Sequence, residues 1–157
     1  MTWIKEEFTS KDLQRLLSKL AENVKAFNGL SPSELTELLA DSEKCTYEAG
    51  DNIVKEGNVG THMYVIIDGE ALVGKKGQGG NVELARLCTA DSFGEMAMAD
   101  REVRSATVKA LSHCVLVRIN DNAMGRNPEI AMKVYRNIAS VLSERLRNAD
   151  ELLAWRL

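Results

Sequence analysis

Histidine and cysteine, the residues that most often bind metals or form disulfides, are scarce in this sequence: 157 residues contain two histidines and three cysteines. Cys45, Cys88 and Cys114 are odd in number and form no C-x-x-C pair, which argues against a disulfide framework and favours reduced core thiols. His62 and His113 lie in segments predicted as different strands, so the histidine cluster of a metal-dependent enzyme is missing. No Ser-His-Asp or Cys-His arrangement is suggested either. We therefore expect no metal site, no cofactor and no catalytic activity.

Long hydrophobic runs and an excess of positive charge are also missing. The longest apolar run is Met63–Ile67, and Met1–Glu7 lacks the basic segment and apolar core of a signal peptide. We therefore expect a cytoplasmic protein that does not enter a membrane. Lys and Arg number 20 against 23 Asp and Glu, a formal charge of −3, which argues against a nucleic-acid binder. This balance leaves room for a small anion, which needs one or two local positive charges.

What is present is the composition of an ordinary globular domain, 45% hydrophobic and 27% charged, and we predict a single domain over residues 1–157. Its N-terminal part, 1–41, has the pattern of two helices, the first with Thr9 or Ser10 as N-cap. The leucines of this helix recur at helical spacing: Leu13, Leu16, Leu17 and Leu20. The second helix begins at Ser31–Glu34, which supplies an N-cap, a proline and the acidic residue of a capping box.

Residues 44–119 change to short strands punctuated by glycine. Seven segments are rich in apolar or β-branched residues and are bounded by turn signals: 44–47, 53–55, 63–68, 70–75, 82–87, 106–110 and 114–119. Gly77–Gly80 predicts a hairpin tip, because it lacks the lysine of a phosphate-binding loop. With the flanking helices, these strands predict a mainly β fold with flanking α, a small antiparallel β-roll or jelly-roll barrel.

Residues 120–157 return to helix. Asn127-Pro128-Glu129 is a good helix start, and a helix from Pro128 to Trp155 would be on the order of 40 Å long. Its apolar residues keep close to one face: Ile130, Val134, Ile138, Val141, Leu142, Leu146 and Leu153. Because this helix is longer than a small barrel needs for cover, we expect part of it to pack on another surface. A homodimer through the C-terminal helix or the N-terminal helix is compatible with the pattern.

The segment with the most chemical information is Phe93–Val108. A helical turn over 95–99 would offer free N–H groups to an anion, and Arg104 could add a two-pronged hydrogen bond to phosphate oxygens. Ionised Glu95 only accepts hydrogen bonds, and a ribose hydroxyl is a suitable donor. The alternative interpretation is structural: Glu95 caps a short helix, and Arg104 pairs with Glu95 or Asp100 at the surface.

With its flanking segments, this stretch resembles the cyclic nucleotide-binding domain family, in the form found in protein-kinase regulatory subunits and the bacterial catabolite activator. The family's phosphate-binding cassette, residues 93–108 here, has Phe-Gly-Glu, then small and apolar residues, then Arg-Ala/Ser-Ala-Thr-Val. Phe93-Gly-Glu and Arg104-Ser-Ala-Thr-Val match this pattern. Upstream, Tyr47–Ile53 and Met63–Glu70 are similar to the family's strand and turn signatures.

The resemblance covers roughly residues 30 to 146 and has two departures. Val103 stands where many members have proline, and Thr89-Ala90 replaces a Pro-Gly or Glu-Gly turn. Both affect loop stiffness more than ligand contacts. Downstream, Arg126–Ile130 is similar to the start of the family's C-terminal helix.

The resemblance implies a ligand site in the cassette and on the last helix. Glu95 would accept from the ribose 2′-hydroxyl, and Arg104 and Ser105 would hold the cyclic phosphate. Arg145 and Leu146 fall where the family's helix meets the base, and Arg145 could stack on a purine or reach its edge; its alternative is a solvated helix arginine. The other ligand-binding residues implied are Phe93, Gly94, Met96, Ala97 and Ala106.

The leading hypothesis is a non-enzymatic sensor that repositions its C-terminal helix when the ligand binds. Serine at position 105 occurs in cAMP-binding bacterial members, whereas threonine there favours cGMP, so we expect cAMP ahead of cGMP. Two alternatives stay open: a ligand-independent dimerisation or protein-interaction module on the same fold, and a fragment of a DNA-binding regulator, whose helix-turn-helix would follow the long helix. We expect an effector protein in another chain, and no nucleic acid bound by this chain alone.

Overall fold

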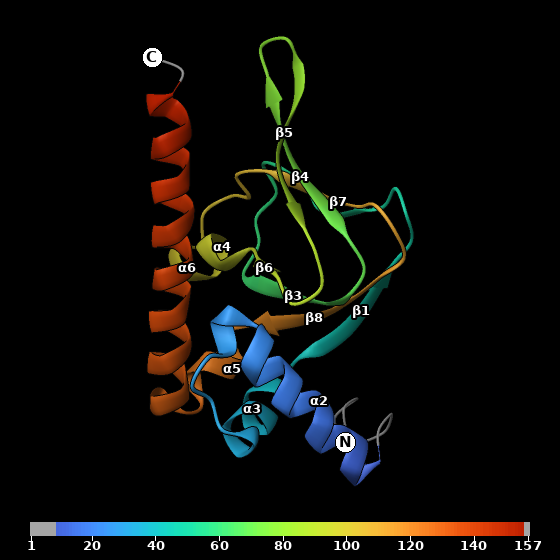
Figure 1. Ribbon diagram of the computed structural model, residues 1–157, viewed down its shortest axis with the longest axis vertical. Coiled ribbons are helices and arrows are strands. Elements are labelled where there is room, and N and C mark those ends of the chain that lie inside the picture. Colours follow the sequence, from blue (N-terminus) through green and yellow to red (C-terminus); the bar gives the residue numbers. More distant parts are fainter. Residues whose placement is uncertain (1–8, 156–157) are drawn as a thin grey trace.

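The computed structural model describes residues 9–155 and contains two β-sheets with helices along one side and at one end of them (Figure 1). The helices are α2 (Ser10–Asn23), η1 (Lys25–Phe27), α3 (Pro32–Leu39), α4 (Glu95–Asp100), α5 (Asp121–Gly125) and α6 (Pro128–Ala154). The strands are β1 (Glu43–Tyr47), β2 (Asn52–Val54), β3 (His62–Asp68), β4 (Ala71–Gly77), β5 (Gly80–Leu87), β6 (Ser92–Phe93), β7 (Thr107–Ala110) and β8 (Cys114–Asn120). The prediction for Met1–Glu7 lies outside the described residues.

The strands form a roll of two four-stranded sheets. One sheet has the order β1-β8-β3-β6 and the other β2-β7-β4-β5, with every pairing antiparallel. Because the chain crosses repeatedly from one sheet to the other, neighbouring strands are mostly not consecutive, as in a jelly roll. The predicted fold class, mainly β with flanking helices, is confirmed.

All seven predicted strands exist, with ends that differ by at most two residues. The predicted hairpin tip is also confirmed, since Gly77 pairs with Gly80 at the end of the β4–β5 ladder, and this hairpin projects beyond the rest of the sheets (Figure 1). Strand β6 was not predicted; its two residues pair with Tyr64 and Val65 of β3. A two-residue strand is too short to show any alternation of apolar and polar residues.

Both predicted N-terminal helices begin at their predicted caps. The Thr9 side chain accepts a hydrogen bond from the Asp12 backbone N–H at the start of α2. At the start of α3, the Ser31 hydroxyl accepts from the Glu34 N–H while the Glu34 carboxylate accepts from the Ser31 N–H. These bonds satisfy backbone donors that the first turn of a helix leaves free.

The alternation of β3 divides the core into two clusters. Met63 and Val65 point out of the roll and pack with the helices, whereas Tyr64 and Ile66 point into it. The outer cluster buries leucines of α2 and α3 and the first half of α6. The three cysteines are free, but the expectation that all are core residues is wrong: Cys114 is buried, Cys45 is half-buried and Cys88 is exposed.

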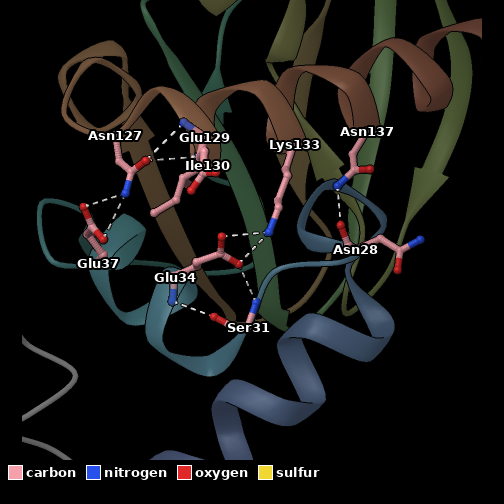
Figure 2. A network of polar contacts seen from close by, with 9 residues as sticks. All are labelled: Asn28, Ser31, Glu34, Glu37, Asn127, Glu129, Ile130, Lys133 and Asn137. Atoms are coloured by element: carbon pink, nitrogen blue, oxygen red, sulfur yellow. Dashed lines mark hydrogen bonds and ion pairs between the residues drawn. The ribbon is translucent and has the colours of Figure 1, made fainter.

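Polar contacts fasten the first half of α6 to α3 and η1 (Figure 2). The Lys133 ammonium lies 2.7 and 2.9 Å from the two carboxylate oxygens of Glu34, the residue that also completes the α3 capping box. The Asn137 side-chain amide donates to the backbone carbonyls of Ala26 and Asn28. The base of α6 is therefore held to the N-terminal helices by side chains as well as by the outer core.

The second half of α6 is more exposed than the first half, because the buried residues of this helix end at Val141. Leu146, Leu152, Leu153 and Trp155 are all exposed, so the apolar face predicted for the whole helix is covered only in its first half. No helix within residues 9–155 is long and apolar enough to cross a membrane.

The turn between β3 and β4 requires glycine, and this can be tested. Gly69 has φ +108°, and a Cβ there would lie 2.5 Å from the His113 carbonyl oxygen. We expect Gly69→Ala to lower the free energy of unfolding by roughly 2 kcal/mol or more, measured by urea denaturation. Gly79, at the hairpin tip, has nothing within 4 Å of a built Cβ, so Gly79→Ala should change stability by less than about 0.5 kcal/mol. Equal losses would show that the Gly69 conformation is not required.

Candidate functional site

The short helix α4 starts at a glycine whose missing side chain makes room for an arginine. Gly94 is the N-cap of α4 and has φ +81°. A Cβ there would lie 2.6 Å from Arg104 Nη1 and 2.9 Å from the His62 carbonyl oxygen. Gly94 therefore serves two purposes, a left-handed backbone conformation and close passage of the Arg104 guanidinium.

Arg104 is a buried cation held by carbonyl oxygens. The residue is 7% exposed, Nη1 donates to the Gly94 carbonyl at 3.2 Å, and Nη2 donates to the His62 carbonyl at 2.8 Å. The guanidinium carbon lies 5.8 Å from the centroid of the Tyr64 ring, within range of a cation–π interaction. A Cβ on Gly60 would come within 2.5 Å of three guanidinium atoms, so a side chain at position 60 would displace the guanidinium from this position.

Burial lowers the pKa of Arg104, against smaller upward effects of Tyr64 and Glu95, yet an arginine stays charged in a protein. Within residues 9–155 this cation forms no ion pair, and its hydrogen bonds go to two neutral carbonyls. A buried charge without a counter-ion is costly, and an anion that reached it would be bound strongly. The expected alternative, a surface pair of Arg104 with Glu95 or Asp100, is wrong.

Glu95, the first residue of α4, is bonded instead to α6. Its carboxylate is 2% exposed and accepts from the Ser92 hydroxyl at 2.6 Å and from Arg145 Nη1 at 3.4 Å. Arg145 Nη2 also donates to the Ser92 carbonyl at 2.6 Å. Arg145 is therefore not a solvated helix arginine, and Glu95 is not a helix cap. The two residues join α6 to the start of α4, although 50 positions separate them in the chain.

The remaining predicted site residues lie around these two charges. Phe93 is buried and its ring stacks on Tyr64, with centroids 5.0 Å apart. On α4, Ala97 is buried and Met96 is exposed. Tyr64 had no place in the sequence-based site, although the alternation of β3 could have shown that it points into the roll with Ile66.

The last three predicted residues have no side-chain hydrogen bond that ties them to Glu95 or Arg104. Ser105 is exposed and Ala106 half-buried, directly after Arg104. Leu146 is exposed beside Arg145 on α6. In the described part of the chain no group of three or more His, Cys, Asp or Glu side chains could hold a metal ion. The fold and site thus define an antiparallel roll with a buried cation and a buried carboxylate at the start of one short helix.

Comparisons with known proteins identify this arrangement. A family model described as cyclic nucleotide-binding domain matches residues 44–126. A cAMP-dependent protein kinase regulatory subunit of Schizosaccharomyces pombe is 32% identical over 125 residues, which are 79% of this chain and 30% of that protein. Cyclic GMP-binding protein C of Dictyostelium discoideum is 30% identical over 131 residues, 78% of this chain and 5% of that protein. This chain spans less than a third of the length of either relative.

Among solved structures, the catabolite activator protein of Thermus thermophilus matches with a TM-score of 0.76 and 29% sequence identity, over 83% of this chain and 62% of that one. The chain belongs to the cyclic nucleotide-binding domain family. This family is one of binding and regulatory domains.

The contact between Arg145 and Glu95 predicts unequal effects of two arginines on one helix. Arg145→Ala removes the cation beside a buried carboxylate; because Arg145 is 43% exposed, we expect a loss of only about 1 kcal/mol in the free energy of unfolding. Arg136→Ala, at an exposed position of α6, should change it by less than about 0.5 kcal/mol. Urea denaturation of the ligand-free protein measures both. The same small change in both variants would contradict the contact.

Proposed function

We propose that this chain is a regulatory sensor that binds a cyclic nucleotide, with cAMP preferred over cGMP. The observation that carries the proposal is the buried Arg104 cation, which lacks an ion pair among the described residues and is bonded to two carbonyl oxygens. A cyclic phosphate would supply the missing charge, held by Arg104 and Ser105 with backbone groups of Gly94, Met96 and Ala97. Arginine is suited to this because its planar guanidinium donates two parallel hydrogen bonds to phosphate oxygens.

Glu95 would bind the ribose through a hydrogen bond. When ionised, its carboxylate can only accept hydrogen bonds, and in the structure its donors are Ser92 and Arg145. A ribose 2′-hydroxyl donating to Glu95 would compete with the longer of these bonds, the 3.4 Å contact to Arg145. Arg145 would then be free to meet the base, together with Leu146. Ligand binding would thus exchange a protein donor on α6 for a ligand donor.

This exchange would couple ligand binding to the conformation of the protein. The first half of α6 is fastened to α3 and η1 through Lys133 and Asn137. Its second half has no buried residue after Val141, and Glu144 ties it to Lys25 of η1 by an exposed ion pair at 2.7 Å. If the ligand releases Arg145, the part of α6 that loses its contact with the roll is this second half. Such a helix has two positions whose populations a ligand can shift, provided that it binds one of them better.

The output of the sensor would lie in a partner. Leu146, Leu152, Leu153 and Trp155 form the uncovered end of α6, and a second copy of the chain or an effector protein could cover them. The relatives' names favour a binding role over catalysis, and we propose no enzymatic activity and a cytoplasmic location. A module that works by protein contact alone, or part of a DNA-binding regulator, are the competing proposals.

The main test is nucleotide binding by a variant at position 104. Arg104→Ala removes the charge proposed to meet the phosphate, and we expect its cAMP affinity to fall by roughly 100-fold or more. Titration calorimetry measures the affinity, with Arg86→Ala on the exposed strand β5 as a matched control that keeps it. Unchanged cAMP binding in the Arg104 variant would refute the site. No heat and no thermal shift with cAMP or cGMP in the unaltered chain would favour the protein-contact module.

Ser105 provides a separate test of which nucleotide is preferred. In this family threonine at this position favours cGMP and alanine favours cAMP; guanine carries an exocyclic amino group that a hydroxyl can accept from. One such hydrogen bond corresponds to about tenfold in affinity. We expect Ser105→Thr to raise the ratio of cGMP to cAMP affinity by about tenfold and Ser105→Ala to lower it, in competition binding with both nucleotides. Ratios that do not change would remove Ser105 from the ligand site.

A further inference from the structure

A pocket of about 330 Å³ is lined by residues of β2, the β2–β3 connection, β3 and β8. Arg104 is among its lining residues, but no residue of α4 or α6 lines it. The pocket is therefore distinct from the site between the cassette and Arg145, and the two share Arg104. Its volume is at the lower end of the range of small-molecule sites.

The pocket is positively charged. Lys55, Arg104 and Arg118 line it together with His62, and the described residues of the lining include no aspartate or glutamate. Positive side chains gathered in a hollow with protein walls focus the field and attract anions. Such a concentration of charge stands out in a chain whose formal charge is −3.

Arg118 has a hydrogen-bond donor that the described residues leave without a partner. Its Nη2 is bonded to the carboxylate of Glu43, an exposed residue of β1. Its Nε is buried and has no hydrogen-bond partner within residues 9–155. A buried donor without a partner carries a desolvation cost, and it belongs to one of the residues that line the pocket.

The charges of the two pocket arginines also act on His62. The pKa of its imidazole is lowered, first by burial and then by the charges of Arg118 and Arg104, against an opposite effect of Glu43. Lys55 adds a further positive charge to the lining. An anion in the pocket would offset the two arginines and would therefore raise the pKa of His62.

We propose that this pocket is a second anion site, which binds a phosphate group, either free or as the end of a phosphomonoester. The N–H groups of Arg104 that the carbonyls of Gly94 and His62 leave free would donate to it, and Lys55 and Arg118 would add positive charge around it. Where the inference extends to regulation, it rests on the proposed function, because Arg104 would then face two anions. Two anions that share one cation weaken each other's binding, and this coupling is reciprocal.

The direct test is a pH titration of the full chain, followed by NMR of its histidine rings, in inorganic phosphate and in chloride at equal ionic strength. The chain has only two histidines, and His113, which is bonded to Glu48 and does not line the pocket, is an internal control. We expect phosphate to raise the pKa of His62 relative to chloride, with the His113 ring signals the same in both salts. Equal responses of both histidines would mean general screening and would overturn the proposal.

Two variants with opposite effects keep the test decisive. Arg118→Gln removes a donor and a charge, and we expect phosphate affinity to fall about tenfold or more. Glu43→Gln removes the carboxylate that competes for Arg118, and phosphate should then bind more tightly. Arg86→Gln, on β5 and outside the pocket, is the matched control. If neither Arg118→Gln nor Glu43→Gln changes the response of His62, the proposal is wrong.

Two further measurements identify the chemical source of the phosphate group and distinguish the anion site from the proposed cAMP site. Glycerol 3-phosphate binding more tightly than inorganic phosphate would identify a phosphomonoester as the ligand, and equal affinities would identify free phosphate.

Phosphate should also weaken cAMP binding about fivefold beyond the chloride control, and Arg118→Gln should abolish this effect. If the chain binds no cAMP, the proposed function fails while the His62 titration still decides the anion site. If cAMP binds and phosphate leaves His62 unmoved, the anion site alone fails.

Discussion

A single buried guanidinium, that of Arg104, sets most of the constraints on the residues around it. Gly60 and Gly94 have no side chains because the guanidinium occupies that space, and the carbonyls of His62 and Gly94 are turned toward it. The Tyr64 ring lies beneath it and stacks on Phe93 of the cassette. Since none of these partners carries a negative charge, the site keeps a buried cation without a counter-ion among the described residues, and an anion that reached it would be bound strongly.

The second constraint is the carboxylate of Glu95, which is as buried as Arg104 but already has a cationic partner. That partner, Arg145, belongs to α6, whose first half is fixed to the N-terminal helices. One bond of the site is thus also a bond between the roll and the helix. In such an arrangement a ligand that takes over the carboxylate changes the position of a helix through competition for one acceptor, without any change in the core of the roll.

Structural features that depend on residues close together in the chain could be predicted from the sequence. The capping box at Ser31, the hairpin tip at Gly77–Gly80 and the cassette from Phe93 all depend on local spacing. The contact of Arg145 with Glu95 and the role of Tyr64 could not, because they arise when α6 and β3 reach the cassette from far away in the chain. Ala90, noted as a departure from a glycine turn, has φ +75°, so the chain keeps the turn with a less suitable residue.

The most direct test of the central claim is a structure of the chain determined with cAMP bound. We expect the cyclic phosphate to contact the Arg104 guanidinium and the ribose hydroxyl to donate to Glu95, with the hydrogen bond from Arg145 to Glu95 broken and the second half of α6 displaced. A nucleotide bound elsewhere, or one bound with Arg104 untouched and Arg145 still on Glu95, would contradict both the site and the mechanism.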